Sequence, residues 1–269
     1  MGVAIELTWL GQSGLRLDAG GTVVYVDPYL SDSVEHHHGA QYQRQVPVPV
    51  QPADITDADC VLITHEHLDH CDPETLPALA DASPECTFLA PHEIRKTLIG
   101  FGITEDRILQ PRERWLSIGP GVEVHPVPAA HPLVERDGDG CLRYLGYVID
   151  CGGRRLYHAG DTSPHEHVID ALLELAPIHV AALPVNEFNF FRSRMGIVGN
   201  MSVREAFGLA EAIGVESVVP IHWDMFRPNS VFPEEIELVY RKSYEQAHDA
   251  AESKAPSPPF ELRFAPGEL

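Results

Sequence analysis

The chain has 269 residues, of which 44% are hydrophobic and 22% are charged, as is typical of a soluble globular protein. Its 40 acidic residues outnumber 19 basic residues and give a formal net charge of −21, which argues against a general role in nucleic-acid binding. No apolar run approaches the roughly 18–20 residues that a bilayer-spanning helix needs, so we expect no membrane partner.

Short apolar runs alternate with helical segments along the chain, without a linker or a short-period repeat. This pattern predicts one α/β domain, residues 1–269, with two mixed sheets flanked by helices. Gly152-Gly153 is predicted as a hairpin turn, and 255–269 as a loop, a short strand and a frayed tail. In chain order, the predicted elements are strands 5–10, 22–26 and 60–63; helices 73–82 and 91–99; strands 122–127, 145–149 and 155–158; helix 164–175; strand 179–183; helix 202–213; strand 217–221; and helix 233–251.

A capping box predicts where one of these helices begins. Glu205 follows Ser202 by three residues, so the Ser202 hydroxyl can accept from the Glu205 amide while the Glu205 carboxylate reaches back. Two segments lack a clear period and are predicted as loops. The first, 35–52, contains three consecutive histidines at 36–38 and continues with a Pro-rich stretch, and the second is 184–202.

Cysteine usage and the first residues indicate the compartment. The five cysteines are odd in number, widely spaced and free of a C-x-x-C motif, which argues against a disulfide framework and a zinc ribbon. The N-terminal residues carry neither the basic segment nor the long apolar stretch of a secretory signal. We therefore predict a cytoplasmic protein, and the sequence leaves homo-oligomerisation open.

Metal-capable side chains follow four of the predicted strands. In layered α/β proteins, ligands gather at one end of the strands, so residues distant in sequence can meet there. Within the first group, the side chains at 65 and 67 can face one point in space, and those at 69 and 70 can face a neighbouring point. This arrangement predicts two metals. The residues are His65, His67, Asp69 and His70 in THEHLDHCD, then His131 in PAAHP, Asp161 in YHAGDT and His222 in PIHWD.

These residue types suit zinc and hydrolysis. Neutral imidazoles bind borderline cations such as zinc, and a carboxylate can bridge two cations. Two cations about 3.5–4 Å apart lower the pKa of a shared water, orient it and stabilise the oxyanion formed by its attack. Asp27, at the end of a strand, is either a carboxylate that orients a ligand imidazole or a turn residue.

The run His65-Glu66-His67-Leu68-Asp69-His70 resembles the H-x-H-x-D-H signature of the metallo-β-lactamase superfamily. The later histidines and aspartate stand in the order and approximate spacing of that family's remaining ligands. Shorter motifs, among them TWLGQSG at 8–14, VDPYLSDS at 26–33 and GNMSVREA at 199–206, resemble the branch that includes L-ascorbate-6-phosphate lactonase. The resemblance covers nearly the whole chain and implies a four-layer αββα sandwich with the metals at one edge of the two sheets.

The resemblance also implies a role for each ligand. Zinc is expected because the set is rich in nitrogen, with manganese as the alternative. Asp69 and Asp161 are expected to be catalytic, holding the attacking water and moving its proton to the leaving group. Metal one would be bound by His65, His67 and His131, metal two by Asp69, His70 and His222, and Asp161 would bridge them.

Segment 184–202 is expected to lie over the metal edge and to bind the substrate. Arg192 and Arg194 could grip a phosphate or carboxylate through forked hydrogen bonds, and surface ion pairs are the alternative role for them. The other expected substrate contacts are Asn186, Glu187, Asn189 and Trp223, with burial in the core as the alternative for Trp223.

Together these features predict a metal-dependent hydrolase that uses a metal-bound hydroxide on a small anionic molecule, a lactone or ester such as a sugar-phosphate lactone. The first alternative is a phosphodiesterase acting on a cyclic nucleotide or a phospholipid-like diester, which a basic groove would favour. An iron-dependent redox role is disfavoured, because His67 stands where that branch of the superfamily carries a carboxylate. A non-enzymatic, metal-stabilised binding protein is disfavoured by the complete ligand set.

Overall fold

The computed structural model describes residues 5–249 and 261–262, with side chains described as far as residue 243. The first half of the chain forms a six-stranded sheet whose spatial order β1-β2-β3-β4-β5-β6 is also the order along the chain. Strands β1 to β3 are antiparallel, and β3 to β6 are parallel. The strands are β1 (Ile5–Gly11), β2 (Gly14–Ala19), β3 (Thr22–Val26), β4 (Cys60–Leu62), β5 (Thr87–Leu89) and β6 (Ile108–Leu109).

The second half forms the other sheet, whose seven strands run in the order β13-β12-β11-β10-β9-β8-β7. Strands β7 to β10 are antiparallel, and β10 to β13 are parallel. The strands are β7 (Leu116–Gly119), β8 (Val122–Pro128), β9 (Leu145–Cys151), β10 (Arg154–His158), β11 (Val180–Pro184), β12 (Ser217–Ile221) and β13 (Glu261–Leu262).

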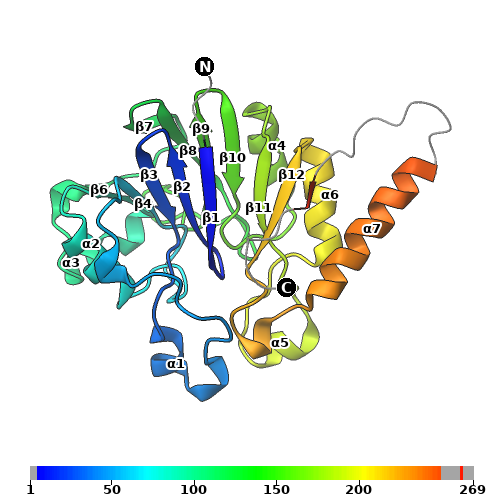
Figure 1. Ribbon diagram of the computed structural model, residues 1–269, viewed down its shortest axis with the longest axis horizontal. Helices are drawn as coiled ribbons and strands as arrows, with labels where there is room; N and C mark the ends of the chain where they lie inside the picture. Colours follow the sequence, from blue (N-terminus) through cyan, green and yellow to red (C-terminus); the bar gives the residue numbers. More distant parts are fainter. Residues whose placement is uncertain (1–4, 250–260, 263–269) are drawn as a thin grey trace.

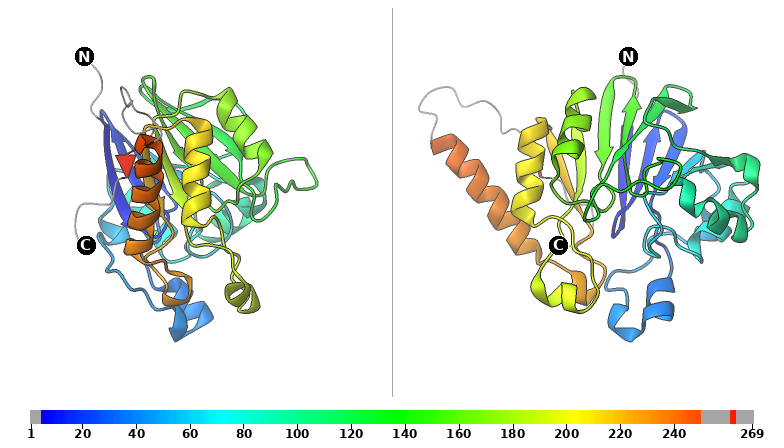
Figure 2. Two further views of the ribbon diagram at one scale, coloured as in Figure 1. Left: turned by 90° about the vertical axis from the view of Figure 1, so that its right-hand side faces the viewer. Right: turned by 180° about the vertical axis from the view of Figure 1, so that it is seen from behind.

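Helices cover the outer faces of both sheets. Figure 1 shows α2 and α3 beside the first sheet, and α4, α6 and α7 beside the second. Two short helices, α1 and α5, project together from one edge of the sandwich in every view (Figures 1 and 2). The helices are α1 (Ser33–His38), α2 (Thr75–Ala82), α3 (Arg95–Gly100), α4 (Glu166–Glu174), α5 (Phe190–Arg194), α6 (Val203–Ile213) and α7 (Pro233–Asp249), with 3-10 turns at Ala40–Tyr42, Pro52–Asp54, His92–Ile94, Glu105–Arg107 and Arg227–Asn229.

Three apolar layers hold the sandwich together. Between the sheets, Leu17 and Val24 belong to the same buried cluster as Tyr147 and Ile149. A second cluster joins the first sheet to α2, and a third joins the second sheet to α4 and α6. The predicted four-layer αββα fold is therefore confirmed.

All eight predicted strands occur, with ends that differ by at most two residues from the predicted ones. The structure adds β2, β5, β6 and β7, which the sequence did not reveal. Predicted helix 91–99 is split into a 3-10 turn and α3, and the last two residues of predicted helix 233–251 lie outside the described residues. The same holds for residues 1–4 and for the predicted tail except β13.

Two predicted loops contain helices. The segment 35–52 begins within α1, and the segment 184–202 contains α5. Each helix has only five or six residues, too few to give a recognisable period. For α5, a capping signal was present, because the Asn189 side chain accepts hydrogen bonds from the amides of Phe191 and Arg192.

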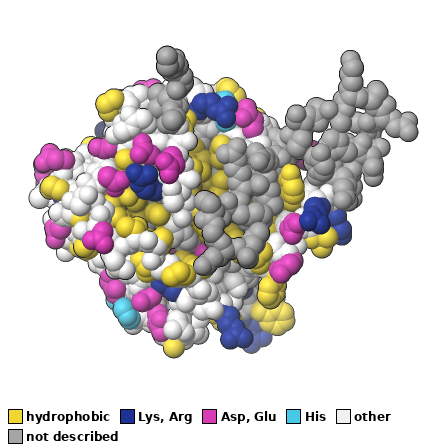
Figure 3. Space-filling view, in the orientation of Figure 1, with side chains coloured by type: hydrophobic (Ala, Val, Ile, Leu, Met, Phe, Trp, Pro, Cys, Tyr) yellow, Lys and Arg dark blue, Asp and Glu magenta, His cyan; other side chains and the backbone are white. Residues whose placement is uncertain are grey.

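The surface agrees with the acidic composition. On the face seen in Figure 3, acidic side chains are scattered and basic side chains form isolated spots, with no continuous basic patch. The five cysteines are all free, as predicted. Among the described residues, no helix combines the length and apolarity needed to cross a bilayer.

Candidate metal centre

The segment after β4 turns back on itself and presents the first group of predicted ligands. The amides of His70 and Cys71 both donate to the carbonyl of His67, at 3.0 and 2.7 Å, which closes a tight turn. His131 follows β8, Asp161 follows β10 and His222 follows β12. The loops that follow strands of both sheets therefore bring all seven side chains to one edge.

Four of these side chains form one cluster: His65, His67, His131 and Asp161. Their candidate ligand atoms lie within 4.8 Å of one another. The Nε2 atom of His65 is 2.9 Å from Nδ1 of His67. All but His67 are buried. Such spacing lets one cation touch several of these atoms at once.

Asp69, His70 and His222 form a second cluster of the same kind. Oδ2 of Asp69 is 3.2 Å from Nε2 of His222 and 3.7 Å from Nε2 of His70. The two clusters are the ones that the resemblance implied, so the geometry offers two neighbouring cation positions.

Asp161 lies between the clusters and turns one carboxylate oxygen toward each. Its Oδ1 is 3.4 Å from Nε2 of His70 and 3.3 Å from Nε2 of His222. Its Oδ2 is 3.7 Å from Nε2 of His131. This is the geometry that a bridging carboxylate requires.

Several ligand atoms lack the partners that burial demands. Within the described part of the chain, Nε2 of His70, Nε2 of His131 and Oδ1 of Asp161 are buried without a hydrogen-bond partner. Buried polar atoms are almost always satisfied, because an unpaired one costs about 1–3 kcal/mol. Cations at the two clusters would satisfy all three, and the imidazole and carboxylate donors suit zinc. The residues therefore fit two divalent cations.

Burial and charge set the protonation of the histidines. Burial lowers the pKa of His131 to about 4 and lowers that of His65 well below its usual value, so both rings are neutral at pH 7. Burial acts in the same direction on His70 and His222, but nearby carboxylates, Asp161 foremost, outweigh it and raise the pKa of each ring. His65 and His131 thus present free lone pairs, whereas at His70 and His222 a cation has to compete more strongly with protons.

A buried carboxylate orients one ligand ring. Oδ2 of Asp27 is 2.7 Å from Nδ1 of His70, which leaves Nε2 of that ring for the cluster. Asp27 also accepts from the amide and hydroxyl of Thr64, at 2.8 and 2.6 Å. Of its two predicted roles, the structure places Asp27 in contact with a ligand imidazole.

Gln12 is a site residue that the sequence analysis missed. Its side-chain amide donates to Oδ2 of Asp69 at 2.7 Å and lies 3.1 Å from Nε2 of His222. Gln12 lies in the motif TWLGQSG, and a glutamine in a turn carries no metal signal of its own. The backbone offers a second signal: Gln12, Asp27 and His222 have φ angles of 53°, 43° and 61°, and such conformations gather at functional sites.

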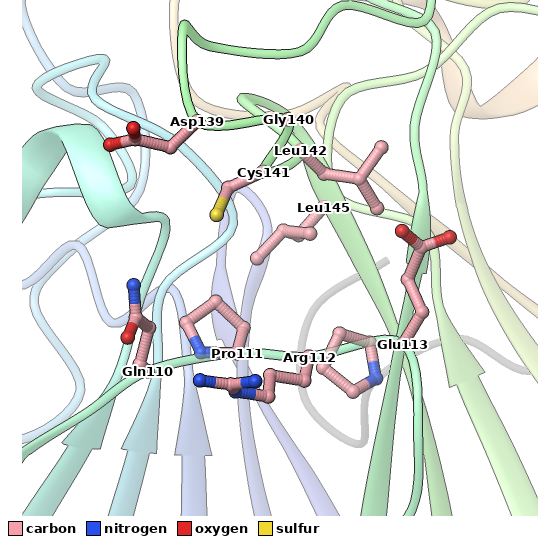
Figure 4. A pocket seen from close by; sticks show the side chains of 10 residues that line it. Gln110, Pro111, Arg112, Glu113, Asp139, Gly140, Cys141, Leu142 and Leu145 are labelled. Atoms are coloured by element: carbon pink, nitrogen blue, oxygen red, sulfur yellow. The ribbon is translucent and has the colours of Figure 1, made fainter.

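An open cavity of about 420 Å³ lies beside the ligands and is lined by His67, Asp69, Asp161 and His222 together with residues from α1 and from 195–198. A second cavity, of about 370 Å³, lies between 110–113 and 139–145 (Figure 4). That second cavity is lined by none of the seven ligands. The cavity at the ligands, called the metal-edge cavity below, is thus the candidate substrate site.

The residues predicted to bind substrate hold this edge together from outside the cavity. The Arg192 guanidinium donates to the carbonyls of Asn186, Glu187, Pro228 and Ser230, and Arg194 lies over the Phe190 ring at 5.6 Å. The Asn186 side chain is buried between Asn200 and Asn229.

The remaining predicted contacts are also placed elsewhere. Asn189 caps α5, Glu187 is exposed with a φ of 35°, and Trp223 stacks on Trp9 at 5.7 Å. None of the six predicted substrate residues is among the described residues that line the metal-edge cavity.

Comparison with known proteins agrees with this geometry. The family model of the beta-lactamase superfamily domain matches residues 22–223. A probable L-ascorbate-6-phosphate lactonase of Escherichia fergusonii is 25% identical over 279 residues, covering 86% of this chain and 73% of the relative. An uncharacterized protein of Mycobacterium tuberculosis is 26% identical over 223 residues, or 83% of this chain and 59% of the relative, so the match spans less than two thirds of that protein.

Two solved structures share the fold. Igni18, a metallo hydrolase from the archaeon Ignicoccus hospitalis, is 21% identical with a TM-score of 0.70, covering 98% of this chain and 96% of that chain. The isothiocyanate hydrolase from Delia radicum gut bacteria is 18% identical with a TM-score of 0.70, covering 97% of both chains. At these identities the likeness concerns the fold alone.

Proposed function

Because this chain belongs to the beta-lactamase superfamily, we propose that it is a two-metal hydrolase that opens an ester or lactone bond in a small molecule. The observation that supports the proposal most strongly is Asp161, whose two carboxylate oxygens face the two ligand clusters. Zinc fits the nitrogen-rich donor set best, and manganese remains the alternative.

The chain's own residues would bind the cations, orient the attacking water and move its proton. Two divalent cations held by the clusters would lower the pKa of a water and stabilise the negative charge that develops on the attacked carbonyl. Oδ2 of Asp69 faces the space between His70 and His222, where it can accept the proton of the attacking water and return it to the leaving oxygen. The Gln12 amide donates to this same oxygen and fixes the direction of the carboxylate.

Lactone opening is supported by the related lactonase at 25% identity, and attack on a carbonyl uses the same chemistry for esters and lactones. The anionic substrate predicted from sequence relied on Arg192 and Arg194. Arg192 donates to backbone carbonyls and Arg194 lies over Phe190, so neither contact supports an anionic substrate. We therefore propose the type of bond that is cleaved and leave the charge of the substrate open. A sugar-phosphate lactone is one substrate to test.

Phosphodiester cleavage is the alternative to compare. A diesterase for a cyclic nucleotide or phospholipid would gain from basic side chains near the metals. The face in Figure 3 carries only isolated basic spots, and no Lys or Arg is among the described residues that line the metal-edge cavity. These observations favour carbonyl attack.

The test combines metal content with turnover. We expect protein purified without chelator to hold two metal equivalents by mass spectrometry and to cleave p-nitrophenyl acetate or a sugar-phosphate lactone faster than bis-p-nitrophenyl phosphate. Asp69→Asn should lower kcat by about 10²–10⁴-fold, the contribution of a positioned proton-transfer group. Asp161→Asn should lose metal as well as turnover, because it weakens a ligand of both cations.

The matched control is Asp81→Asn on α2, an exposed aspartate that should change neither quantity. An Asp161→Asn protein with two metals and normal kcat would show that the bridging role is wrong. Faster cleavage of the diester would favour the alternative, and two bound metals with no turnover of any of these compounds would favour a non-enzymatic role.

A further inference from the structure

We infer that the metal-edge cavity binds an uncharged aliphatic group, so that the preferred substrates are neutral esters or lactones with a short alkyl chain rather than phosphorylated sugars. The inference rests on the proposed hydrolase function and adds the chemical class of its substrate. It is carried by two apolar walls, by the absence of Lys and Arg from the described lining, and by the metal ligands that line the same cavity.

The first wall is packed and preformed. Val34 of α1, Tyr42 and Phe226 line the cavity and belong to one apolar cluster that also contains Tyr29. The centre of the Phe226 ring lies 5.7 Å from that of Tyr29 and 6.0 Å from that of Tyr42. The first contact is tilted and the second is edge-on, and aromatic pairs prefer such geometries. Leu68 lies between the candidate ligands His67 and Asp69 in the sequence and packs against this wall.

The second wall exposes its apolar side chains. Met195, Ile197 and Val198 line the cavity from the segment after α5, and Met195 and Val198 are 52% and 38% exposed. The segment is held in place, since the amides of Met195 and Ile197 both donate to the Arg192 carbonyl at 3.0 Å. An aliphatic group between the two walls would remove apolar surface on both sides from water.

Away from the ligand clusters, the described lining offers an anionic occupant no Lys or Arg. Of its three carboxylates, Asp69 and Asp161 belong to the clusters, whose cations would offset their charge, and Glu66 lies outside them. His38 and Asn229 also line the cavity. Of the nearby cations, Arg192 is engaged by backbone carbonyls, and Arg44 donates to the carbonyls of Tyr29, Ser31 and Val46. A phosphate or carboxylate placed between the walls, away from the metals, would lose its hydration without gaining a cationic partner.

A cavity of about 420 Å³ is the size that holds small molecules, and four ligands form part of its lining. A carbonyl placed at the ligands therefore leaves its alkyl substituent between the walls. Each methylene that leaves water contributes a factor of about 4 to binding when fully buried, and less in an open cavity.

The experiment uses the full chain loaded with two zinc equivalents and p-nitrophenyl acetate, butyrate and hexanoate. We expect kcat/KM to rise about twofold to fourfold per methylene. The mono-p-nitrophenyl ester of adipic acid, which has six carbons like hexanoate but ends in a carboxylate, should react at least about 10-fold more slowly than hexanoate.

Ile197→Ala should lower kcat/KM for hexanoate about 5-fold to 10-fold more than it lowers kcat/KM for acetate, with the zinc content of wild type, since it removes apolar surface only from the second wall. Ile99→Ala, the same substitution at an exposed position of α3, is the control and should match wild type.

Equal kcat/KM for acetate and hexanoate would overturn the inference and leave the hydrolase function standing. Preference for the adipate ester would overturn it in favour of the anionic substrate predicted from sequence. If the zinc-loaded protein cleaves no ester, the proposed function for esters fails, and the inference fails with it.

Discussion

Gln12, Asp27 and His222 share a left-handed backbone and a place at the metal edge, and at the scale of single residues this links strain to function. Each such residue costs on the order of 1–3 kcal/mol and persists only where its surroundings fix it. Here the His222 amide donates to the Gln12 carbonyl at 2.9 Å, and Asp27 is fixed by Thr64 and His70.

The clustering of the candidate ligands could be predicted from sequence, because few residue types bind metals and their spacing is distinctive. Gln12 could not be predicted, because its side-chain amide acts through another residue, Asp69. Its turn is also stabilised by contacts distant in sequence, such as the Asp224 carboxylate, which accepts from the backbone amide of Gln12. Sequence could not distinguish the two roles of Arg192 for a related reason: a guanidinium that donates to four carbonyls and one that binds an anion look identical in a sequence.

Asp27→Asn should weaken zinc binding about 10-fold to 100-fold, because the amide cannot supply the charge that holds and polarises the His70 ring. Competition with a zinc chelator would measure the change. Asp72→Asn is a stringent control, since Asp72 is also buried but contacts Ser31 and Thr75 instead of a ligand. Equal zinc affinity of the two variants would show that Asp27 does not position the His70 ring for zinc binding.

At the scale of elements, a continuous run of buried residues revealed a strand better than length did. β3 and β12, each with five buried residues, were predicted with correct ends, whereas the six-residue β2 was missed. β5 and β6 have three and two residues, and they exist because their neighbours in the sheet supply hydrogen bonds. By contrast, α6 begins as predicted, since its capping box is a local interaction between Ser202 and Glu205.

The segment between β11 and α6 depends on a glycine at its base. A Cβ on Gly199 would lie 2.4 Å from Cα of Phe188, so Gly199→Ala must displace backbone. We expect it to cost about 1–3 kcal/mol of unfolding free energy, measured by urea denaturation, and to lower kcat/KM for hexanoate.

Gly208→Ala is the matched control, because its Cβ would meet nothing within 4 Å and the residue lies inside α6. This substitution should stabilise the protein by up to about 1 kcal/mol. Equal stability of the two variants would mean that the 188–199 contact is looser than the structure shows.

At the scale of the whole molecule, the candidate metal centre draws side chains from both sheets. His65, His67, Asp69 and His70 follow a strand of the first sheet, and His131, Asp161 and His222 follow strands of the second. Cations bound to both groups would stabilise the folded state by about 2.7 kcal/mol per site at a free concentration of 100 times Kd.

Removing the metals with a chelator should therefore lower Tm by about 5–10 °C per saturated site, and added zinc should restore it. Differential scanning calorimetry would measure both steps. The same treatment should shift Asp161→Asn less, because that variant holds less metal before chelation. An unchanged Tm of the wild-type protein after chelator treatment would show that metal binding does not stabilise the packing of the two sheets.

The order of the strands also bears on how the protein is made. Each sheet is built from one continuous half of the chain, and the first is complete at β6, before β7 begins. A nascent chain that has just left the ribosome with its first sheet carries four of the ligands but none of the three that come after β8, β10 and β12. Cations captured at that stage would be held incompletely and could exchange. In the proposed two-metal enzyme, the full set of candidate ligands would exist only once His222 has been synthesised, so the second part of the polypeptide would complete a site that the first part has begun.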